Sequence, residues 1–343
     1  LRNIQIMINF IQFTLTRAFL SIVTLLIVCF IVFSLMELVP GTCAERYLAF
    51  KNTQGSQITF EDIAAEEKRL GLDKPFLYRY TKWVSDIVIK QDFGDSCILR
   101  ISINELLSGR FVLSLTIAIT ALLFSYAIAI PVGIISATTK YASLDNALKF
   151  VSYLGIALPN FLVALCIMLF MTVYYGDTMT GLFSQEYENA PWSSAKVQDF
   201  LSRAWLPIFV LGWNATAFAL QTVRALMLDE NDKLYVMAAR ARGVSGMSLL
   251  WRYPAKHSLG PVINSIGFDL NRIFSALPVV ALILILTEAG ALLIEALARS
   301  NDQQLAGAII FLLTATIVFV NFVTDIILAI MDPRIRRGVM GGS

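Results

Sequence analysis

Long apolar runs, and not short alternating ones, dominate the pattern of hydrophobic and polar positions along the chain. Six runs are long enough for a helix to cross a bilayer, which takes about 20 apolar residues. They cover residues 18–39, 111–139, 150–176, 204–223, 260–287 and 305–331. Because only a helix satisfies its backbone hydrogen bonds within one run, the pattern predicts six transmembrane helices and excludes an outer-membrane barrel.

Composition agrees with this pattern. Hydrophobic residues make up 57% of the chain, charged residues 15%, and the mean hydropathy is +0.69. A water-soluble domain of this length would carry more charge. We therefore predict an all-α membrane protein.

Lysine and arginine collect in alternate connections between the runs. The connection after the second run holds Lys140 and Lys149, and the tail holds Arg334, Arg336 and Arg337. The connection after the fourth run holds the largest group, which is Arg224, Lys233, Arg240, Arg242, Arg252 and Lys256. Basic short loops stay in the cytoplasm, so both termini are predicted to be cytoplasmic. The first run is too long for the apolar part of a signal peptide, so we expect an uncleaved anchor.

Residues 40–105 are predicted to form a small, mainly helical extracytoplasmic domain. Thr59 followed by Asp62 is typical of a helix start, and Gly71 of a helix end. A second helix is expected over 75–90, with an apolar face that would lie on the first transmembrane helix or on the membrane surface. This face consists of Leu77, Tyr80, Val84, Ile87 and Val88. The domain would act either as a spacer or as a contact for a partner.

Two cysteines stand at the two ends of this domain. Cys43 follows the first run and Cys97 precedes the second. We predict that they form a disulfide in an oxidising periplasm, closing a loop worth about 4 kcal/mol. The alternative is two free thiols.

Catalytic patterns are scarce. His257 is the single histidine, and the spacings of zinc proteases, dithiol redox sites, serine hydrolases and phosphate-binding loops do not occur. We predict no catalytic residue, no cofactor site and no metal site in this chain, and no nucleic-acid partner. If nucleotide drives the protein, a partner must hydrolyse it.

The basic connection after the fourth run has a helical pattern of its own. Residues 234–242 favour a helix, and Gly243 is placed to end it in a left-handed cap. Three alanines, Ala238, Ala239 and Ala241, are small enough to let another surface approach. Ser245 is placed to cap a second short helix. By composition alone the segment would be an ordinary cytoplasmic loop.

The order of its residues indicates more. Ala238-Ala239-Arg240-Ala241-Arg242-Gly243-Val244-Ser245, with Pro261 eighteen residues after Gly243, resembles the EAA loop of binding-protein-dependent ABC importer permeases of the dipeptide and oligopeptide type. In that family the loop forms the coupling helix, which fits a groove on the ATPase subunit. The resemblance implies that these eight residues couple the chain to an ATPase.

Further motifs extend the resemblance over nearly the whole chain. They follow the family in order, and together they are more specific than any one alone. They are Val39-Pro40-Gly41, Gly71-Leu72-Asp73-Lys74-Pro75, Asp92-Phe93-Gly94-Asp95-Ser96, Ile130-Pro131-Val132-Gly133, Ala157-Leu158-Pro159-Asn160-Phe161, Asn321, Asp325 and Asp332-Pro333-Arg334-Ile335-Arg336. The long domain between the first two helices is typical of the first of the family's two permease subunits.

The resemblance implies a type I ABC importer permease fold in a bacterial inner membrane. It divides the chain into an anchor helix (1–39), a periplasmic domain (40–105), a permease core (106–331) with a coupling loop (229–257), and a cytoplasmic tail (332–343). The implied partners are a second permease subunit, two ATPase subunits, a periplasmic binding protein and membrane lipid. ATP and Mg²⁺ would be bound by the ATPases, so this chain would not be an enzyme.

Two departures from the family pattern affect these expectations. Met237 stands where the EAA pattern has its acid, so no salt bridge is expected there. After the fifth helix the chain reads Glu288-Ala-Gly-Ala-Leu-Leu-Ile-Glu295 and lacks the usual Pro-Gly-Leu-Gly. Peptides are the expected cargo, with nickel chelates, opines or sugars as alternatives.

Charged residues within the last two runs are candidates for function. Asp269 and Arg272 share a helix face, and ionisable groups in a span usually face a cavity or each other. They would either line a cavity that carries cargo or form a structural ion pair. Asn321 and Asp325 are expected to hold helices together.

A secondary transporter is the main rival, but internal repeats and interrupted helices, its usual signs, are not evident. A membrane-embedded enzyme is disfavoured because no nucleophile and base occur together.

Overall fold

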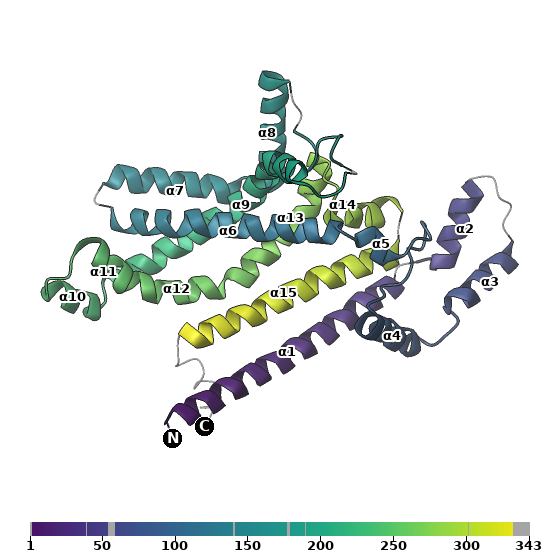
Figure 1. Cartoon of the computed structure of the whole chain (residues 1–343), viewed down its shortest axis with the longest axis horizontal. Coiled ribbons are helices and arrows are strands. Elements are labelled where there is room, and N and C mark those ends of the chain that lie inside the picture. The colour runs from purple at the N-terminus through teal and green to yellow at the C-terminus, as the bar shows by residue number, and fades with distance from the viewer. Residues whose placement is uncertain are drawn as a thin grey trace. The chain divides into compact units, whose positions relative to one another are not determined.

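The computed structural model describes residues 2–38, 40–53, 59–139, 141–176, 179–188, 190–300 and 302–331. Within these ranges the regular secondary structure is all helical, apart from one isolated antiparallel bridge between Asp95 and Ser102 (Figure 1). The helices are α1 (Arg2–Leu38), α2 (Cys43–Thr53), α3 (Phe60–Leu70), α4 (Phe76–Ser85), the π-helical η1 (Asp86–Lys90), α5 (Ile103–Leu107), α6 (Arg110–Thr138), α7 (Ala142–Ala157), α8 (Asn160–Tyr175), α9 (Ser194–Asn231), α10 (Leu234–Ala241), α11 (Gly246–Arg252), α12 (Pro254–Asn264), α13 (Ile266–Leu284), α14 (Ala289–Ile294), the π-helical η2 (Glu295–Arg299) and α15 (Gln303–Met331).

Five helical segments of the described chain are long and apolar enough to cross a membrane, and a sixth span results if the bent pair α7 and α8 counts as one. The prediction of an all-α membrane protein is confirmed. The five segments are Ile8–Leu38, Ile103–Thr138, Ser194–Asn231, Ile266–Leu284 and Gln303–Ile330.

The predicted third span is wrong as a single helix over 150–176. The helix starts earlier, at Ala142, and the chain bends by 101° between α7 and α8. Leu158 has ψ 120° and Pro159 has ψ 143°, both outside the helical region. The cause is Pro159, which lacks an N–H and pushes the residue before it towards extended backbone.

The fourth span is longer than predicted. Helix α9 has 38 residues and begins at Ser194, inside the stretch expected to be an outer loop. The hydroxyl of Ser193 accepts a hydrogen bond from the backbone N–H of Lys196, so the helix start has a side-chain cap. The first turns of α9 contain polar residues, so the search for apolar runs placed the start of this helix too late.

By their contacts the residues form two compact units. Of the described residues, those in 2–20, 115–286 and 319–331 form the first unit, and those in 21–114 and 287–318 form the second. The predicted division at 39, 105 and 331 follows sequence blocks, so it stays a prediction, and residues 332–343 lie outside the described chain.

Small residues allow close helix packing in the first unit. A Cβ on Gly155 would lie 2.7 Å from the Cβ of Ala217, and the hydroxyl of Ser152 donates to the Ala217 carbonyl. Likewise, Gly267 of α13 lies directly against the Asn321 amide of α15. Arg17 Nη1 is 3.3 Å from Asp325 Oδ2, so α1 and α15 are joined by an ion pair. The ion pair confirms that Asp325 ties helices together, while Asn321 packs against α13.

The second unit contains the predicted extracytoplasmic helices. In α3, Thr59 and Asp62 form a capping box, and Gly71 ends the helix with φ 69°, as predicted. Helix α4 and η1 replace the predicted helix over 75–90, and one side of them packs on α1. The buried residues of this cluster are Cys29, Phe33, Trp83, Ile87 and Phe311.

Tyr80, Val84 and Ile87 of the predicted face pack in this cluster, and Leu77 and Val88 do not. Leu77 and Val88 are 65% and 71% exposed, whereas Phe76 and Trp83 pack against α1 instead. The packing face is shifted around the helix because the two aromatic side chains fill the space beside Phe33.

Candidate functional site

The connection between α9 and α12 folds as a pair of short helices with a small apolar core. Val236 and Ala239 of α10 pack with Leu249 of α11, and all three are buried. Tyr235, Val244 and Tyr253 cover this cluster. The predicted helix over 234–242 is confirmed, and the loop has a defined shape of its own.

Gly243 sets the turn between the two helices. Its φ is +86°, its N–H donates to the Arg240 carbonyl, and the Val244 N–H donates to the Ala239 carbonyl at 3.2 Å. This pair of bonds is the Schellman motif, which places glycine in the left-handed region, so the predicted cap is confirmed. Ser245 occupies the N-cap position of α11, but its side chain makes no capping hydrogen bond, so that part of the prediction is wrong. The backbone of Ser245 is extended, as is usual at an N-cap position.

The outward side of α10 carries apolar side chains, two of which are small. Leu234, Met237, Ala238 and Ala241 follow the helical spacing i, i+3, i+4 and i+7, and all four are exposed. We call these four residues the outer stripe. Ala239 lies in the loop core instead, so only two of the three predicted alanines can meet another surface.

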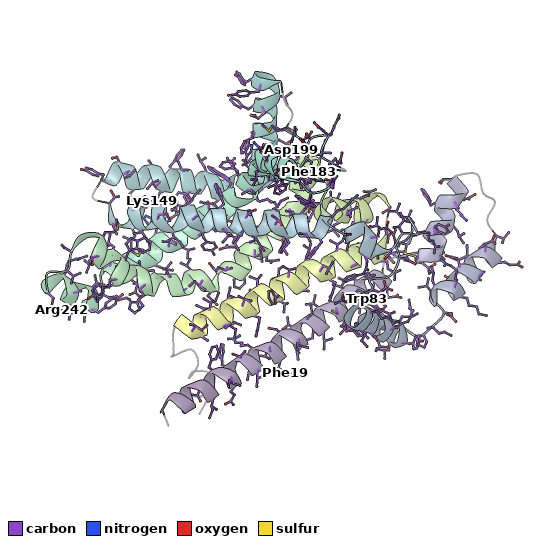
Figure 2. All side chains as sticks on the ribbon, in the orientation of Figure 1. Phe19, Trp83, Lys149, Phe183, Asp199 and Arg242 are labelled. Atoms are coloured by element: carbon purple, nitrogen blue, oxygen red, sulfur yellow. A yellow bond between two sulfur atoms is a disulfide. The ribbon has the colours of Figure 1, made fainter. Side chains whose placement is uncertain are left out.

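Two arginines flank the outer stripe. Arg240 and Arg242 are exposed, and Arg240 Nη2 donates to Asn231 Oδ1 at 2.8 Å. Figure 2 shows Arg242 at one end of the first unit, far from Phe183, which lies between α8 and α9, and from Asp199 near the start of α9. The surface is therefore an apolar strip with a basic border.

Tyr235 anchors the helix pair to α9 and α12, the helices on either side. Its hydroxyl donates to the carboxylate of Glu230 at the end of α9, and its ring meets the His257 ring of α12 edge-on, with centroids 5.1 Å apart. Burial raises the pKa of Tyr235, so the hydroxyl keeps its proton as a donor. His257 thus has a packing role here.

Asp269 and Arg272 form an ion pair within α13, with 3.2 Å between Oδ1 and Nη1. The Asp269 side chain is 7% exposed. Its Oδ2 accepts a hydrogen bond of 2.5 Å from the Tyr126 hydroxyl of α6, and Ser265 lies 3.4 Å away. The carboxylate is therefore fixed by three groups.

The Arg272 guanidinium is less enclosed. Its side chain is 38% exposed, and Cζ lies 3.8 Å from the centre of the Phe218 ring of α9. Along the same side of α13, Phe268, Ser275, Val279 and Leu282 are also exposed. Asn271 is exposed on this side as well, so this face of α13 carries one cation among apolar, amide and hydroxyl side chains.

Cys43 and Cys97 are joined by a disulfide, with Cα atoms 5.5 Å apart. Cys43 begins α2, and Cys97 lies next to Ser96, whose hydroxyl donates to the Asp302 carboxylate. Asp302 precedes α15 and also accepts from the Leu305 N–H. The disulfide therefore adjoins a buried link to the last membrane-spanning helix.

The segment after α13 is built around Glu288, which sequence reasoning recorded only as part of a motif. It is fully buried, and it accepts hydrogen bonds from the N–H groups of Gly290 and Ala291 and from the hydroxyl of Ser114. Burial raises the pKa of this carboxyl. Glutamate is not among the residues that usually cap helices, so the sequence carried no cap signal for Glu288 at the start of α14.

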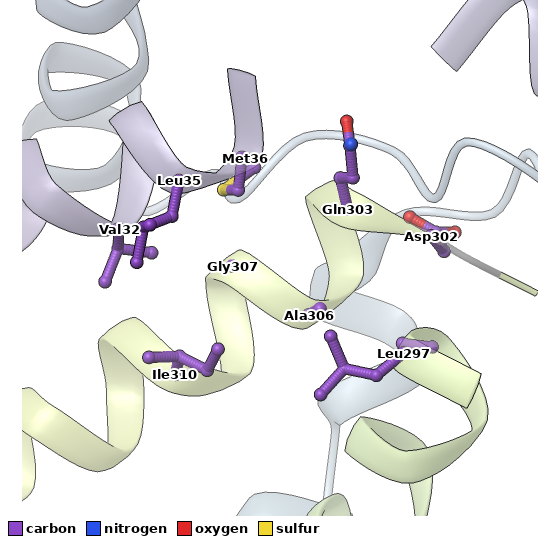
Figure 3. Close-up of a pocket in the computed structure, with 10 residues that line it drawn as sticks. Val32, Leu35, Met36, Leu297, Asp302, Gln303, Ala306, Gly307 and Ile310 are labelled. Carbon is purple, nitrogen blue, oxygen red and sulfur yellow. The ribbon is translucent and has the colours of Figure 1, made fainter. Parts of the chain in front are cut away.

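One cavity of about 260 Å³ lies between α1, η2 and the start of α15 (Figure 3). Its walls are Val32, Leu35, Met36, Ala296, Leu297, Asp302, Gln303, Ala306, Gly307 and Ile310. The Asp302 carboxylate already has its partners, so this cavity offers packing space and no reactive group. Among the described residues no group of three or more His, Cys, Asp and Glu side chains could hold a metal ion.

Comparisons with known proteins agree with this geometry. Residues 129–337 match the family described as "Binding-protein-dependent transport system inner membrane component", and residues 10–101 match its N-terminal component. The oligopeptide transport system permease protein AppB of Bacillus subtilis (strain 168) is 28% identical over 94% of this chain and 99% of its own length.

Two other relatives cover much of the chain. The dipeptide transport system permease protein DppB of Escherichia coli (strain K12) is 25% identical over 95% of this chain and 99% of its own. The inner membrane ABC transporter permease protein YejB of Escherichia coli O157:H7 is 30% identical over 80% of this chain and 76% of its own length.

A solved structure of the MetNI methionine ABC transporter, in inward-facing conformations, shares the fold. The TM-score is 0.53 at 16% identity, and the match covers 66% of this chain and 97% of that chain.

Proposed function

The chain belongs to the family of binding-protein-dependent transport system inner membrane components, and from this membership we propose that it is the first of two permease subunits in an ATP-driven peptide importer. The relatives are named as oligopeptide and dipeptide permeases, which supports a peptide cargo. With a sister permease the chain would form the path for peptides delivered by a periplasmic binding protein. It would lie in the bacterial inner membrane with both termini in the cytoplasm.

In this proposal two partner ATPases bind ATP and Mg²⁺, and this chain transmits their motion. The observation that carries the proposal is the helix pair α10–α11, which exposes the outer stripe on a rigid support. Because the pair has its own core and is held to α9 and α12 through Tyr235, a groove that moves α10 would move both of these helices with it. Such switching between two packed states is typical of ligand-driven transporters.

The outer stripe has the character of a helix that fits a groove. Alanines at 238 and 241 let a second backbone approach closely, and Leu234 and Met237 supply apolar area beside them. Arg240 and Arg242 would stay at the rim, where charge guides association more than it adds affinity.

Replacing Ala238 by Trp tests this docking. The bulky ring would project from the outer stripe and block the groove, without disturbing the loop core around Ala239. We expect loss of copurifying ATPase and of uptake, while the variant still pairs with the sister permease. Ala64→Trp is the matched control, because Ala64 is also exposed on a short helix, in α3. Undiminished ATPase binding by Ala238→Trp would contradict the proposal.

Asp269 and Arg272 are proposed to serve the path itself. Asp269 would hold the guanidinium in place, and Arg272, on the exposed face of α13, would meet the carboxylate of a passing peptide. A cation fixed by a buried acid presents its donors without a large loss of side-chain freedom.

A further inference from the structure

The segment formed by α4 and η1 carries large apolar side chains that the rest of the described chain leaves uncovered. Leu77 and Tyr78 are 65% and 56% exposed, and Val88 and Ile89 are 71% and 76% exposed. Val88 and Ile89 follow Leu77 and Tyr78 by eleven positions, which is about three helical turns, so the two pairs lie on the same side of the segment. These four residues, here called the outer face, therefore form a strip along its full length.

The opposite side of the segment fixes its position along α1. The Tyr80 hydroxyl donates to the Leu26 carbonyl at 3.2 Å, and Ile87 packs in the cluster of Cys29 and Phe33. Near the end of α1, Arg79 forms an ion pair with Glu37. The contacts thus extend from the outer end of the span well into it (Figure 2 labels Trp83 on this segment).

The rise per residue of α1 gives the depth in the bilayer at which α4 and η1 contact it. The apolar stretch of α1 ends at Leu38, and at about 1.5 Å per residue Leu26 lies roughly 18 Å below that end. The hydrocarbon core of a bilayer is about 30 Å thick, so Leu26 is near its middle. A segment that packs between Glu37 and Leu26 occupies the depth of the outer leaflet.

The neighbouring surface of α1 at this depth is itself apolar and open. Ile27, Ile31 and Leu35 are 55%, 50% and 57% exposed, as expected of a helix face in contact with lipid tails. The outer face of α4 and η1 continues this surface. Lys82 and Lys90 are also exposed, and their long stems allow the ammonium groups to reach the headgroups.

We propose that α4 and η1 form an interfacial helix embedded in the outer leaflet, with Leu77 and Val88 in contact with phospholipid acyl chains and Lys82 at headgroup level. Amphipathic helices bind interfaces in this way. The occupant of the outer face is thus the membrane in which α1 sits, and the segment holds the second half of the extracytoplasmic domain at a fixed depth.

Single cysteines in the full-length chain test this proposal. Leu77→Cys, Val88→Cys and Lys82→Cys are introduced with Cys29 and Cys166 replaced by alanine and the disulfide kept intact. The chain is reconstituted in vesicles of phosphatidylethanolamine and phosphatidylglycerol. A charged, water-soluble maleimide should modify positions 77 and 88 at least about tenfold more slowly than position 82, since only the thiolate reacts and apolar burial suppresses it. Phe60→Cys, at a site 91% exposed on α3, reports unhindered labelling.

Spin labels on the same cysteines give a second measurement. Positions 77 and 88 should be more accessible to oxygen than to a water-soluble nickel chelate, and position 82 should show the reverse. Equal labelling at 77, 82 and 88 would overturn the proposal. Protection of 77 and 88 that appears only after a periplasmic binding protein is added would also overturn it, because the outer face would then be a protein contact.

Discussion

The hydroxyl of Ser96 donates a hydrogen bond to the carboxylate of Asp302, which lies 206 positions further along the chain. Asp302 is 1% exposed, and it also accepts from the N–H groups of Ile98 and Leu305. One buried acid therefore caps α15 and holds the loop that follows α4 and η1.

Replacing Asp302 by alanine should destabilise this link. Three donors would lose their acceptor in a buried site, and unsatisfied buried donors cost about 1–3 kcal/mol each, so we expect a loss of roughly 3 kcal/mol in unfolding free energy after partial relaxation. Hydrogen exchange of residues 94–103 and thermal unfolding in detergent measure the effect. Glu186→Ala, at an exposed acid, should change neither. Unchanged exchange in Asp302→Ala would contradict the inferred role of the carboxylate.

Removing the Cys43–Cys97 disulfide should loosen the same region. The two cysteines are 54 positions apart, and closing a loop of that size is worth about 4 kcal/mol on the chain-entropy account. The double variant Cys43→Ser, Cys97→Ser should unfold at a lower temperature and be cleaved faster by protease in its extracytoplasmic part. Cys166→Ser is the control. Mass spectrometry after alkylation without reductant checks the pairing, and full alkylation of Cys43 and Cys97 would refute it.

Helix α3 should lose stability in acid. Hydrogen bonds from Arg69 and Arg100 hold the pKa of Glu66 below its ordinary value of 4.5, and the Thr59 cap lowers the pKa of Asp62. A depressed carboxyl pKa stabilises the folded form above the ordinary value, and this stability is lost as pH falls through the folded pKa. Protection of α3 amides, corrected for intrinsic exchange, should fall below about pH 4.5. Glu66→Gln should weaken this dependence, leaving the part due to Asp62.

Several elements could be predicted because a local signal specifies them. Thr59, Asp62 and Gly71 bound α3, and Gly243 ends α10, since caps depend on neighbouring residues alone. The bend at Pro159 was also present in the sequence, but an apolar run read for length hides a break within it. Proline should therefore be weighed before a run is counted as one span.

Other features depend on contacts between distant segments. Asp145 of α7 receives both Arg224 Nε and Nη2 of α9 at 2.8 Å, and no spacing in the sequence predicts that pair. Similarly, Ala239 was grouped with Ala238 and Ala241 by size, but it faces inward because Leu249 covers it. Whether a side chain on a helix is buried or exposed depends on which other element packs against that helix.

Gly243→Val should uncouple transport from hydrolysis. A side chain at φ +86° is disfavoured, and a β-branched residue in the left-handed region costs about 1–2 kcal/mol, which corresponds to a factor of roughly 5–30 in the population of the native turn. Uptake per ATP hydrolysed in proteoliposomes of the whole complex should fall by a similar factor. Gly260→Val is the matched control, because neither glycine has a neighbour within 4 Å of an added Cβ, and Gly260 has no positive φ. Equal effects of both changes would refute the role of the turn.

Arg272→Gln should lower peptide uptake while assembly with the sister permease is kept. The guanidinium is exposed beside Phe218, and a hydrogen bond to a charged group is worth about 1.5–3 kcal/mol, so a loss of roughly 10–100-fold in transport is expected. Asp269→Asn preserves the bonds to Tyr126 and Ser265 but weakens the hold on Arg272, so a smaller loss is expected. The double variant Asp269→Asn, Arg272→Gln separates the two interpretations of the pair. If the pair is only structural, neutralising both charges removes the buried unpaired acid and should restore uptake towards normal. If Arg272 meets the carboxylate of the peptide, the double variant stays as impaired as Arg272→Gln alone.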